Sequence, residues 1–93
     1  MTPEKVQEVI TRYRTLFDET GVGKTDFPHD ELLDASHYSL RHCHGMLDKM
    51  EIFIKEGRMD KVYRWLGFIQ GVLWSQRIYT LADLMDHNRK DSD

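Results

Sequence analysis

The fold of this 93-residue chain is decided by residues 61–76, which read KVYRWLGFIQGVLWSQ. An α-helix turns by about 100° per residue and would place the apolar residues of this segment on two sides. One side is a stripe of Val62, Trp65, Leu66, Ile69, Val72 and Leu73. The other side gathers Tyr63, Gly67, Gly71, Trp74 and Ile78. So short a chain can cover only one side with its own residues, and we expect the other to contact a partner subunit or a ligand.

A second helix is predicted immediately before this segment. Between residues 28 and 56, apolar or small residues recur at alternating steps of three and four, which is a heptad pattern. They are Leu33, Ser36, Leu40, Cys43, Leu47, Met50 and Ile54. The pattern predicts a straight helix of about thirty residues, roughly 40 Å long. Because a tight turn at residues 56–58 forces antiparallel packing, residues 29–79 are expected to form a helical hairpin.

A shorter helix is predicted on the N-terminal side of the hairpin. Thr2 and Pro3 suit the N-cap and first position of a helix over residues 1–20, and Gly21 suits its end. The next segment, residues 21–28, reads GVGKTDFP and is expected to be a loop because it holds two glycines and a proline.

On the C-terminal side, Thr80 and Asp83 resemble a capping box. They predict a short helix to about His87, followed by a frayed polar tail, within residues 80–93. No strand-like alternation is present. The predicted fold class is therefore all-α, a single domain over residues 1–93 in which a short first helix packs across a long hairpin.

Size and composition favour self-association. A domain of this length buries only about two-thirds of its unfolded surface and is marginally stable. The single cysteine, Cys43, excludes an internal disulfide. Gly67 and Gly71 form a GxxxG pair, which is a weak indication of close helix contact in a soluble chain. We therefore expect a homo-oligomer.

Charge and hydropathy narrow the classes of partner. The net charge of −3 argues against a protein that coats duplex nucleic acid. Arg64 and Gln70 interrupt the most hydrophobic segment, which is then unsuited to crossing a bilayer. No signal peptide is recognisable. These features favour a cytoplasmic protein that binds neither a membrane nor duplex nucleic acid.

The histidines of the predicted second helix do not suggest a metal site. His42, Cys43 and His44 would point about 100° apart, and His37 lies roughly 10 Å from His44 along the helix. Residues so arranged cannot chelate one ion, so no metal or other cofactor is expected. Cys43 lies in the heptad pattern and is interpreted as a small core residue.

Tyr13 admits two interpretations. It lies in the apolar stripe of the first helix and could be a core tyrosine whose hydroxyl finds a hydrogen-bond partner. Alternatively its ring could stack on a nucleobase while nearby cations neutralise phosphate. The residues that could join it are Arg12, Arg14, Lys24, Thr25 and Phe27.

One side of the predicted second helix forms another candidate surface. Its members are Tyr38, Arg41, His42, Gly45 and Lys49. A glycine within a long helix is unfavourable, so Gly45 suggests that something approaches closely. That neighbour could be another helix, or a symmetry axis around which copies of Arg41 and His42 would form a cationic pocket.

The sequence also resembles a known family. The segment GRMDKVYRWLGFIQGVLWSQRIYTLADLMDHNR, with SLRHCHGMLDKM before it, is similar to the helical hairpin domain of small phage proteins that sequester cyclic nucleotides. These proteins are the anti-CBASS sponge and, in its C-terminal half, an anti-Thoeris sponge. The resemblance implies a hexamer that binds cyclic dinucleotides between two protomers and cyclic trinucleotides at threefold contacts, without chemistry.

The resemblance also implies site residues. Tyr13 would stack on a base of the cyclic dinucleotide, with Lys24 on phosphate and Thr25 nearby. Arg12 and Phe27, which lie close to these residues in the sequence, are added to the site from the residue pattern, with Arg12 as a second phosphate contact. The cyclic trinucleotide pocket would use Ser39, Arg41 and His42.

The expected function is therefore non-catalytic sequestration of cyclic oligonucleotides, which would block bacterial anti-phage signalling from within the host cytoplasm. An oligomeric helical adaptor that binds another protein through its second apolar face is the alternative. An enzyme is disfavoured because no nucleophile, base and orienting group lie at a recognisable spacing.

Overall fold

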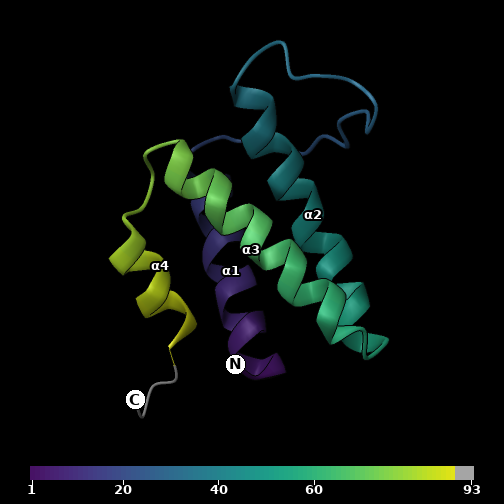
Figure 1. The fold of residues 1–93 in the computed structure, drawn as a ribbon, viewed down its shortest axis with the longest axis vertical. Coiled ribbons are helices and arrows are strands. Elements are labelled where there is room, and N and C mark those ends of the chain that lie inside the picture. The colour runs from purple at the N-terminus through teal and green to yellow at the C-terminus, as the bar shows by residue number, and fades with distance from the viewer. Residues whose placement is uncertain (90–93) are drawn as a thin grey trace.

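The computed structural model describes residues 1–89, and within them the fold is all-α, as predicted. Its four helices are α1 (Pro3–Glu19), α2 (His37–Lys55), α3 (Met59–Ser75) and α4 (Leu81–Asn88). Figure 1 shows α2 and α3 as an antiparallel hairpin, with α1 behind it and α4 beside α3. The frayed tail predicted after α4 falls mainly on residues 90–93, which lie outside the described residues.

The predicted helix ends are confirmed by their capping contacts. Thr2 caps α1 by accepting a hydrogen bond from the amide of Lys5 at 3.1 Å. Gly21 ends that helix with φ at +73°, a conformation that glycine adopts without strain. Thr80 and Asp83 form the predicted capping box of α4, with both reciprocal hydrogen bonds at 3.0 Å.

The long helix predicted from residue 29 is wrong at its beginning, because α2 starts only at His37. In the antiparallel hairpin α3 ends at Ser75, opposite the start of α2. A helix over residues 29–36 would extend past any facing helix, so its apolar residues would have nothing to pack against. Residues 21–36 instead form a loop, in which Leu32 is 95% exposed and Leu33 is 49% exposed.

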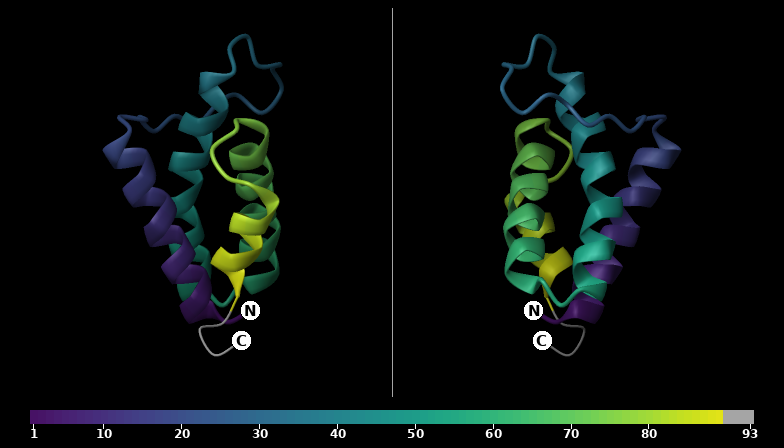
Figure 2. Two further views of the ribbon diagram at one scale, coloured as in Figure 1. Left: turned by 90° about the vertical axis from the view of Figure 1, so that its left-hand side faces the viewer. Right: turned by 90° about the vertical axis from the view of Figure 1, so that its right-hand side faces the viewer.

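The core lies between the hairpin, α1 and α4. Figure 2 shows α1 and α3 at opposite sides of the molecule, while α2 packs against both and α4 packs against α1. The fully buried side chains are Val6, Val9, Ile10, Tyr13, Phe17, Cys43, Leu47, Met50, Val62, Ile69 and Leu73.

The two sides of α3 differ as the sequence predicted. The stripe that begins at Val62 faces the core, with Trp65 and Val72 half-buried at its edges. Tyr63, Gly67, Gly71 and Trp74 on the other side are exposed. The prediction is wrong for Ile78, which was placed on the same side but lies beyond the end of α3 and is half-buried against the core. No helix within residues 1–89 is both long enough and apolar enough to cross a membrane.

Polar contacts join α1 to α2 along the exposed edge of the core. The Arg14 guanidinium forms ion pairs with Glu51 and with Asp48, the latter at 2.9 Å. Gln7 donates a hydrogen bond to Glu51 at 2.8 Å. Because these groups are partly solvated, the contacts orient the helices more than they stabilise them.

Removing a core leucine should destabilise the chain far more than removing a loop leucine. We expect Leu47→Ala to lower the free energy of unfolding by about 2–5 kcal/mol, because it leaves a cavity between α1, α2 and α3. The matched change Leu32→Ala should alter it by less than about 0.5 kcal/mol, because that side chain contacts solvent. Urea denaturation followed by circular dichroism measures both, and equal losses would contradict the assigned loop.

Candidate functional site

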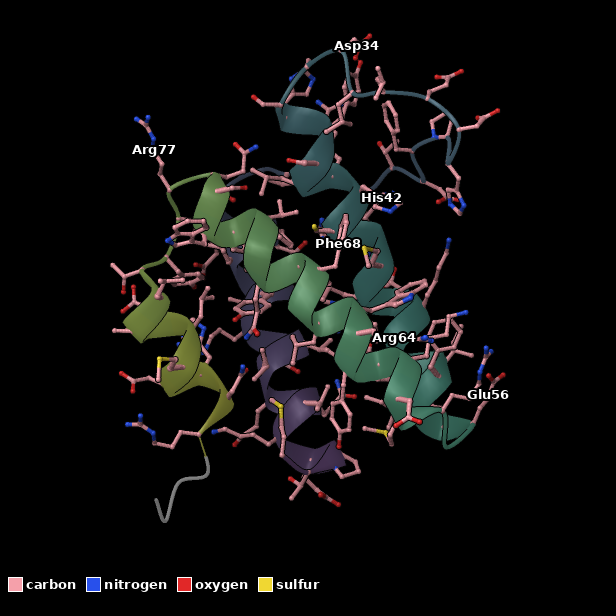
Figure 3. All side chains as sticks on the ribbon, viewed as in Figure 1. Asp34, His42, Glu56, Arg64, Phe68 and Arg77 are labelled. Carbon is pink, nitrogen blue, oxygen red and sulfur yellow. The ribbon has the colours of Figure 1, made fainter. Side chains whose placement is uncertain are left out.

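A cleft opens between α2, α3 and the loop at residues 21–36. Its volume is about 480 Å³, which falls within the range of small-molecule binding sites. Figure 3 shows His42 of α2 and Phe68 of α3 close together along the gap between these helices, with Arg64 further along α3. The cleft is lined by Thr25, Asp26, His29, His42, Gly45, Met46, Lys49, Arg64, Trp65 and Phe68.

The loop is held on α2 by hydrogen bonds to Arg41 and His42 and lies close to Gly45. The amide of Thr25 donates to the carbonyl of Arg41 at 3.2 Å, and the amide of Phe27 donates to Nδ1 of His42 at 3.1 Å. A Cβ at Gly45 would lie 3.3 Å from the Thr25 carbonyl oxygen, so a larger residue would push the loop away. The close approach predicted at Gly45 is confirmed, and the neighbour is loop backbone.

These contacts also orient His42. Because Nδ1 accepts the Phe27 amide proton, the neutral ring carries its own proton on Nε2. Partial burial lowers the pKa of His42, and the neighbouring His29 acts in the same direction. His42 is therefore held neutral at pH 7.

Aromatic surface is accessible in the cleft. Phe68 is 54% exposed and lies edge-on to His42, with ring centroids 6.3 Å apart. Trp65 is half-buried and packs edge-on against Phe53 at 5.0 Å. An exposed ring beside a supported one provides a face on which a planar ligand can stack.

The charges in the cleft favour an anion. Lys49 lies 3.4 Å from Asp26, and its charge is the main reason that the pKa of this carboxyl is lowered. Arg64 forms no ion pair within residues 1–89, so its positive charge is not neutralised by the fold. The lining thus contains two permanent cations and one carboxylate.

The structure brings only part of the predicted site together. Thr25 and His42, expected to serve two different pockets, line the same cleft. Phe27 lies beside it with its ring 5.7 Å from that of Tyr38, and Arg41 stacks its guanidinium over the same tyrosine. Ser39 is outside the cleft, donating to the Ser36 carbonyl at 2.7 Å.

The stacking role predicted for Tyr13 is not possible in this structure, because its side chain is completely buried. Its hydroxyl accepts from Gln70 at 3.0 Å and lies 2.8 Å from Nδ1 of His87, to which it can donate. Burial raises the pKa of Tyr13 to about 12. The core interpretation is confirmed, with the hydroxyl joining α1 to α3 and α4.

The two cations expected beside Tyr13 lie apart from the cleft. Arg12 lines a polar groove between α1 and α4, together with His87. Lys24 forms an ion pair with Asp48 at 2.8 Å, and this contact is the main reason that the pKa of Asp48 is lowered. Neither cation shares a pocket with Thr25.

The contribution of α3 to the cleft was not predicted. Arg64, Trp65 and Phe68 enter it because the loop covers α2 and leaves the adjoining edge of α3 open. Phe68 carried one signal in the sequence, since it is apolar yet belongs to neither of the two sides assigned to its helix. The residues that lie next to Phe68 depend on how α2, α3 and the loop are aligned with one another. The helical periodicity of a single segment does not contain that information.

The described residues show no arrangement suited to metal chemistry or thiol chemistry. Within residues 1–89 no group of three or more His, Cys, Asp or Glu side chains is placed to hold a metal ion. Cys43 is buried, which raises the pKa of its thiol to about 12 and leaves it protonated. The interpretation of Cys43 as a core residue is confirmed.

Comparisons of the chain with protein-family models, with curated proteins and with solved structures find no match. The function must therefore be argued from the chain's own residues. The cleft is the feature that combines accessible aromatic surface, unneutralised positive charge and a hydroxyl group.

Acidification should destabilise the fold through His87, which is buried, and His42, which is partly buried. Burial is the main cause that lowers the pKa of both His87 and His42 in the folded chain, whereas the unfolded chain binds protons near pH 6.5. The free energy of unfolding should therefore be at its highest above about pH 6.5. Below that pH it should decrease by at most about 1.4 kcal/mol per pH unit for each histidine. Urea denaturation at intervals between pH 7.5 and 5 measures this slope.

Substitutions identify the histidines that make the free energy of unfolding depend on pH. His87→Gln and His42→Gln should each reduce the slope, because glutamine can still accept a hydrogen bond but does not titrate. A wild-type stability that rises between pH 6.5 and 5 would contradict the assignment.

Proposed function

We propose that the protein sequesters cyclic oligonucleotides in the cleft between α2, α3 and the loop, without altering them chemically. Its role would be to lower the free concentration of a bacterial immune messenger, as a phage-encoded protein acting in the host cytoplasm. The expected ligands are cyclic dinucleotides and, through further contacts in the assembly, cyclic trinucleotides.

The observation that carries this proposal is the placement of Phe68 beside Arg64, Lys49 and Thr25. A nucleobase can stack on the exposed phenylalanine ring, a contact worth about 1–3 kcal/mol per base. The cations can neutralise phosphate oxygens, and the threonine hydroxyl can donate to one of them. A ligand in which bases and phosphates alternate within one small ring matches this spacing of groups.

Sequestration also requires tight binding, which a single open cleft supplies poorly. Reducing the free ligand a thousandfold needs binding sites in excess at roughly a thousand times Kd. A second copy closing over the cleft would add contacts without a large ordering cost, because the oligomer would form before the ligand arrives. The proposed protein is therefore a homo-oligomer, with a hexamer as the form suggested by the family resemblance.

A panel of cyclic di- and trinucleotides tests the proposal directly. The melting temperature of the protein should rise with at least one of them, and the ligand should be recovered intact after denaturation. Phe68→Ala should weaken binding about 5- to 150-fold, which corresponds to the loss of one stacked base. Isothermal titration calorimetry measures this change.

Matched control variants test whether a loss of affinity is specific to residues that line the cleft. Met85→Ala removes another large exposed apolar side chain, from α4, and should leave affinity unchanged. Lys49→Gln should lower the affinity for the ligand and should make that affinity less dependent on salt concentration. Lys55→Gln, on the same helix, should change neither. Absence of any melting shift, a consumed ligand, or equal losses at Phe68 and Met85 would each overturn the proposal.

An adaptor that binds another protein is the second candidate. It is favoured by the exposure of Trp74 at 52%, Leu81 at 58% and Met85 at 63%, which lie on α3 and α4 away from the cleft. An adaptor would show no melting shift with any cyclic nucleotide. The melting-temperature measurements with the same panel of cyclic nucleotides therefore discriminate between the two functions.

A further inference from the structure

Asp26 places a negative charge in a cleft whose other permanent charges favour an anion. Its side chain is 62% exposed, lines the cleft and lies 3.4 Å from the ammonium of Lys49. A carboxylate at this position repels phosphate and partly neutralises the lysine that would bind it. It is useful only to a ligand that also carries hydrogen-bond donors.

The backbone on both sides of Asp26 is held against α2. The amide of Thr25 donates to the carbonyl of Arg41 at 3.2 Å, and the amide of Phe27 donates to Nδ1 of His42 at 3.1 Å. Asp26 thus lies between two anchored residues, and its carboxylate is positioned before a ligand arrives. Groups held in place in this way discriminate well between ligands, because little ordering remains to be done on binding.

The carboxylate of Asp26 can accept further hydrogen bonds. Its two oxygens lie 3.4 Å from Nζ of Lys49 and 3.6 Å from Nε2 of His29, respectively. Both distances exceed the roughly 2.7–2.9 Å of a strong charge-assisted hydrogen bond. The charge of Lys49 holds the pKa of Asp26 below its usual value, so the carboxylate is ionised at pH 7. Because an ionised carboxylate has about four lone-pair sites, Asp26 can accept from two adjacent N–H donors.

His42 supplies a hydrogen-bond donor near these two acceptors. Its Nδ1 accepts from the amide of Phe27, so the neutral ring carries its proton on Nε2, which makes no hydrogen bond within residues 1–89. The centroid of its ring lies 6.3 Å from that of Phe68 and 6.3 Å from that of His29, the residue beside Asp26. The cleft therefore offers one donor and two acceptors beside the ring on which a base can stack.

We infer that the cleft recognises guanine, and that its ligand is a cyclic dinucleotide with at least one guanine base. The base-pairing edge of guanine carries an acceptor, O6, followed by two adjacent donors, N1–H and the N2 amino group. His42 donates to O6, while Asp26 accepts from N1–H and from the amino group. Adenine presents an amino donor to His42 and an unprotonated N1 to Asp26, and it has no 2-amino group. The inference rests on the proposed function, because it names the base that the same cleft would bind.

Three ligands that differ in one base test this recognition. They are cyclic GMP–AMP, cyclic IMP–AMP, whose hypoxanthine lacks only the 2-amino group of guanine, and cyclic di-AMP. Isothermal titration calorimetry should give the tightest binding with cyclic GMP–AMP, about 5- to 150-fold weaker binding with cyclic di-AMP, and an intermediate affinity with cyclic IMP–AMP. Equal affinities for the three ligands would overturn the inference and leave the proposed function standing. Binding of none of them would overturn the inference together with the proposed binding of cyclic dinucleotides.

Asp26→Asn distinguishes recognition of the base from a simple effect of charge. The asparagine amide has an acceptor and a donor, which match the amino group and N1 of adenine. The variant should therefore lose the preference for guanine and bind cyclic di-AMP at least as tightly as cyclic GMP–AMP. A carboxylate that acted only as a counter-charge to Lys49 would give a different result, because its removal would strengthen binding of all three ligands by the same factor. An unchanged order of affinities in the variant would overturn the inference.

Glu31→Gln is the matched control for the change at Asp26. It removes one negative charge from the same loop, at an exposed position that does not line the cleft. The ratio of the affinities for cyclic GMP–AMP and cyclic di-AMP should be the same in this variant as in the wild type. A guanine preference that is lost equally in both variants would show that the total charge of the loop sets it, and would overturn the assignment to Asp26.

Discussion

The structure depends on one constraint, which is that α3 has apolar residues on two sides while the rest of the chain can cover only one. The side that begins at Val62 is buried against α1 and α2, and this burial supplies the main hydrophobic stabilisation of the hairpin. The opposite side is exposed, and a Cβ at its two glycines, Gly67 and Gly71, would meet no atom of residues 1–89 within 4 Å. The same helix therefore organises the core and leaves a second, partly apolar side exposed.

The cleft arises from the unequal extent of the two hairpin helices and the loop before them. Because α3 ends at Ser75, the segment before His37 finds no helical partner and folds back along α2. Its backbone docks at Gly45, the one position on that side of α2 where no side chain stands in the way. The loop thereby becomes one wall of the cleft, with α2 and the edge of α3 as the others.

A buried polar network fixes the short C-terminal helix. Tyr13, Gln70 and His87 meet through the tyrosine hydroxyl, and Asn88 exchanges two hydrogen bonds with Gln70 at 2.7 and 3.0 Å. Buried polar groups are costly unless they are paired, so these contacts specify one position for α4 against α1 and α3. Apolar contacts alone would specify that position less sharply. The network also explains why Tyr13, although polar and flanked by arginines, belongs to the core.

The sequence by itself determined the helices, their capped ends, the antiparallel hairpin and the buried stripe of α3, because these follow from local spacing and from turns too short to permit another arrangement. It also indicated the close approach at Gly45, because a glycine within a helix is unfavourable unless a neighbour needs the space. Only the tertiary structure decided where α2 begins, whether Tyr13 is buried, and which cations and rings share the cleft. Those outcomes depend on which residues far apart in the chain face one another, and helical periodicity specifies a residue's side of its own helix but not the group that lies opposite.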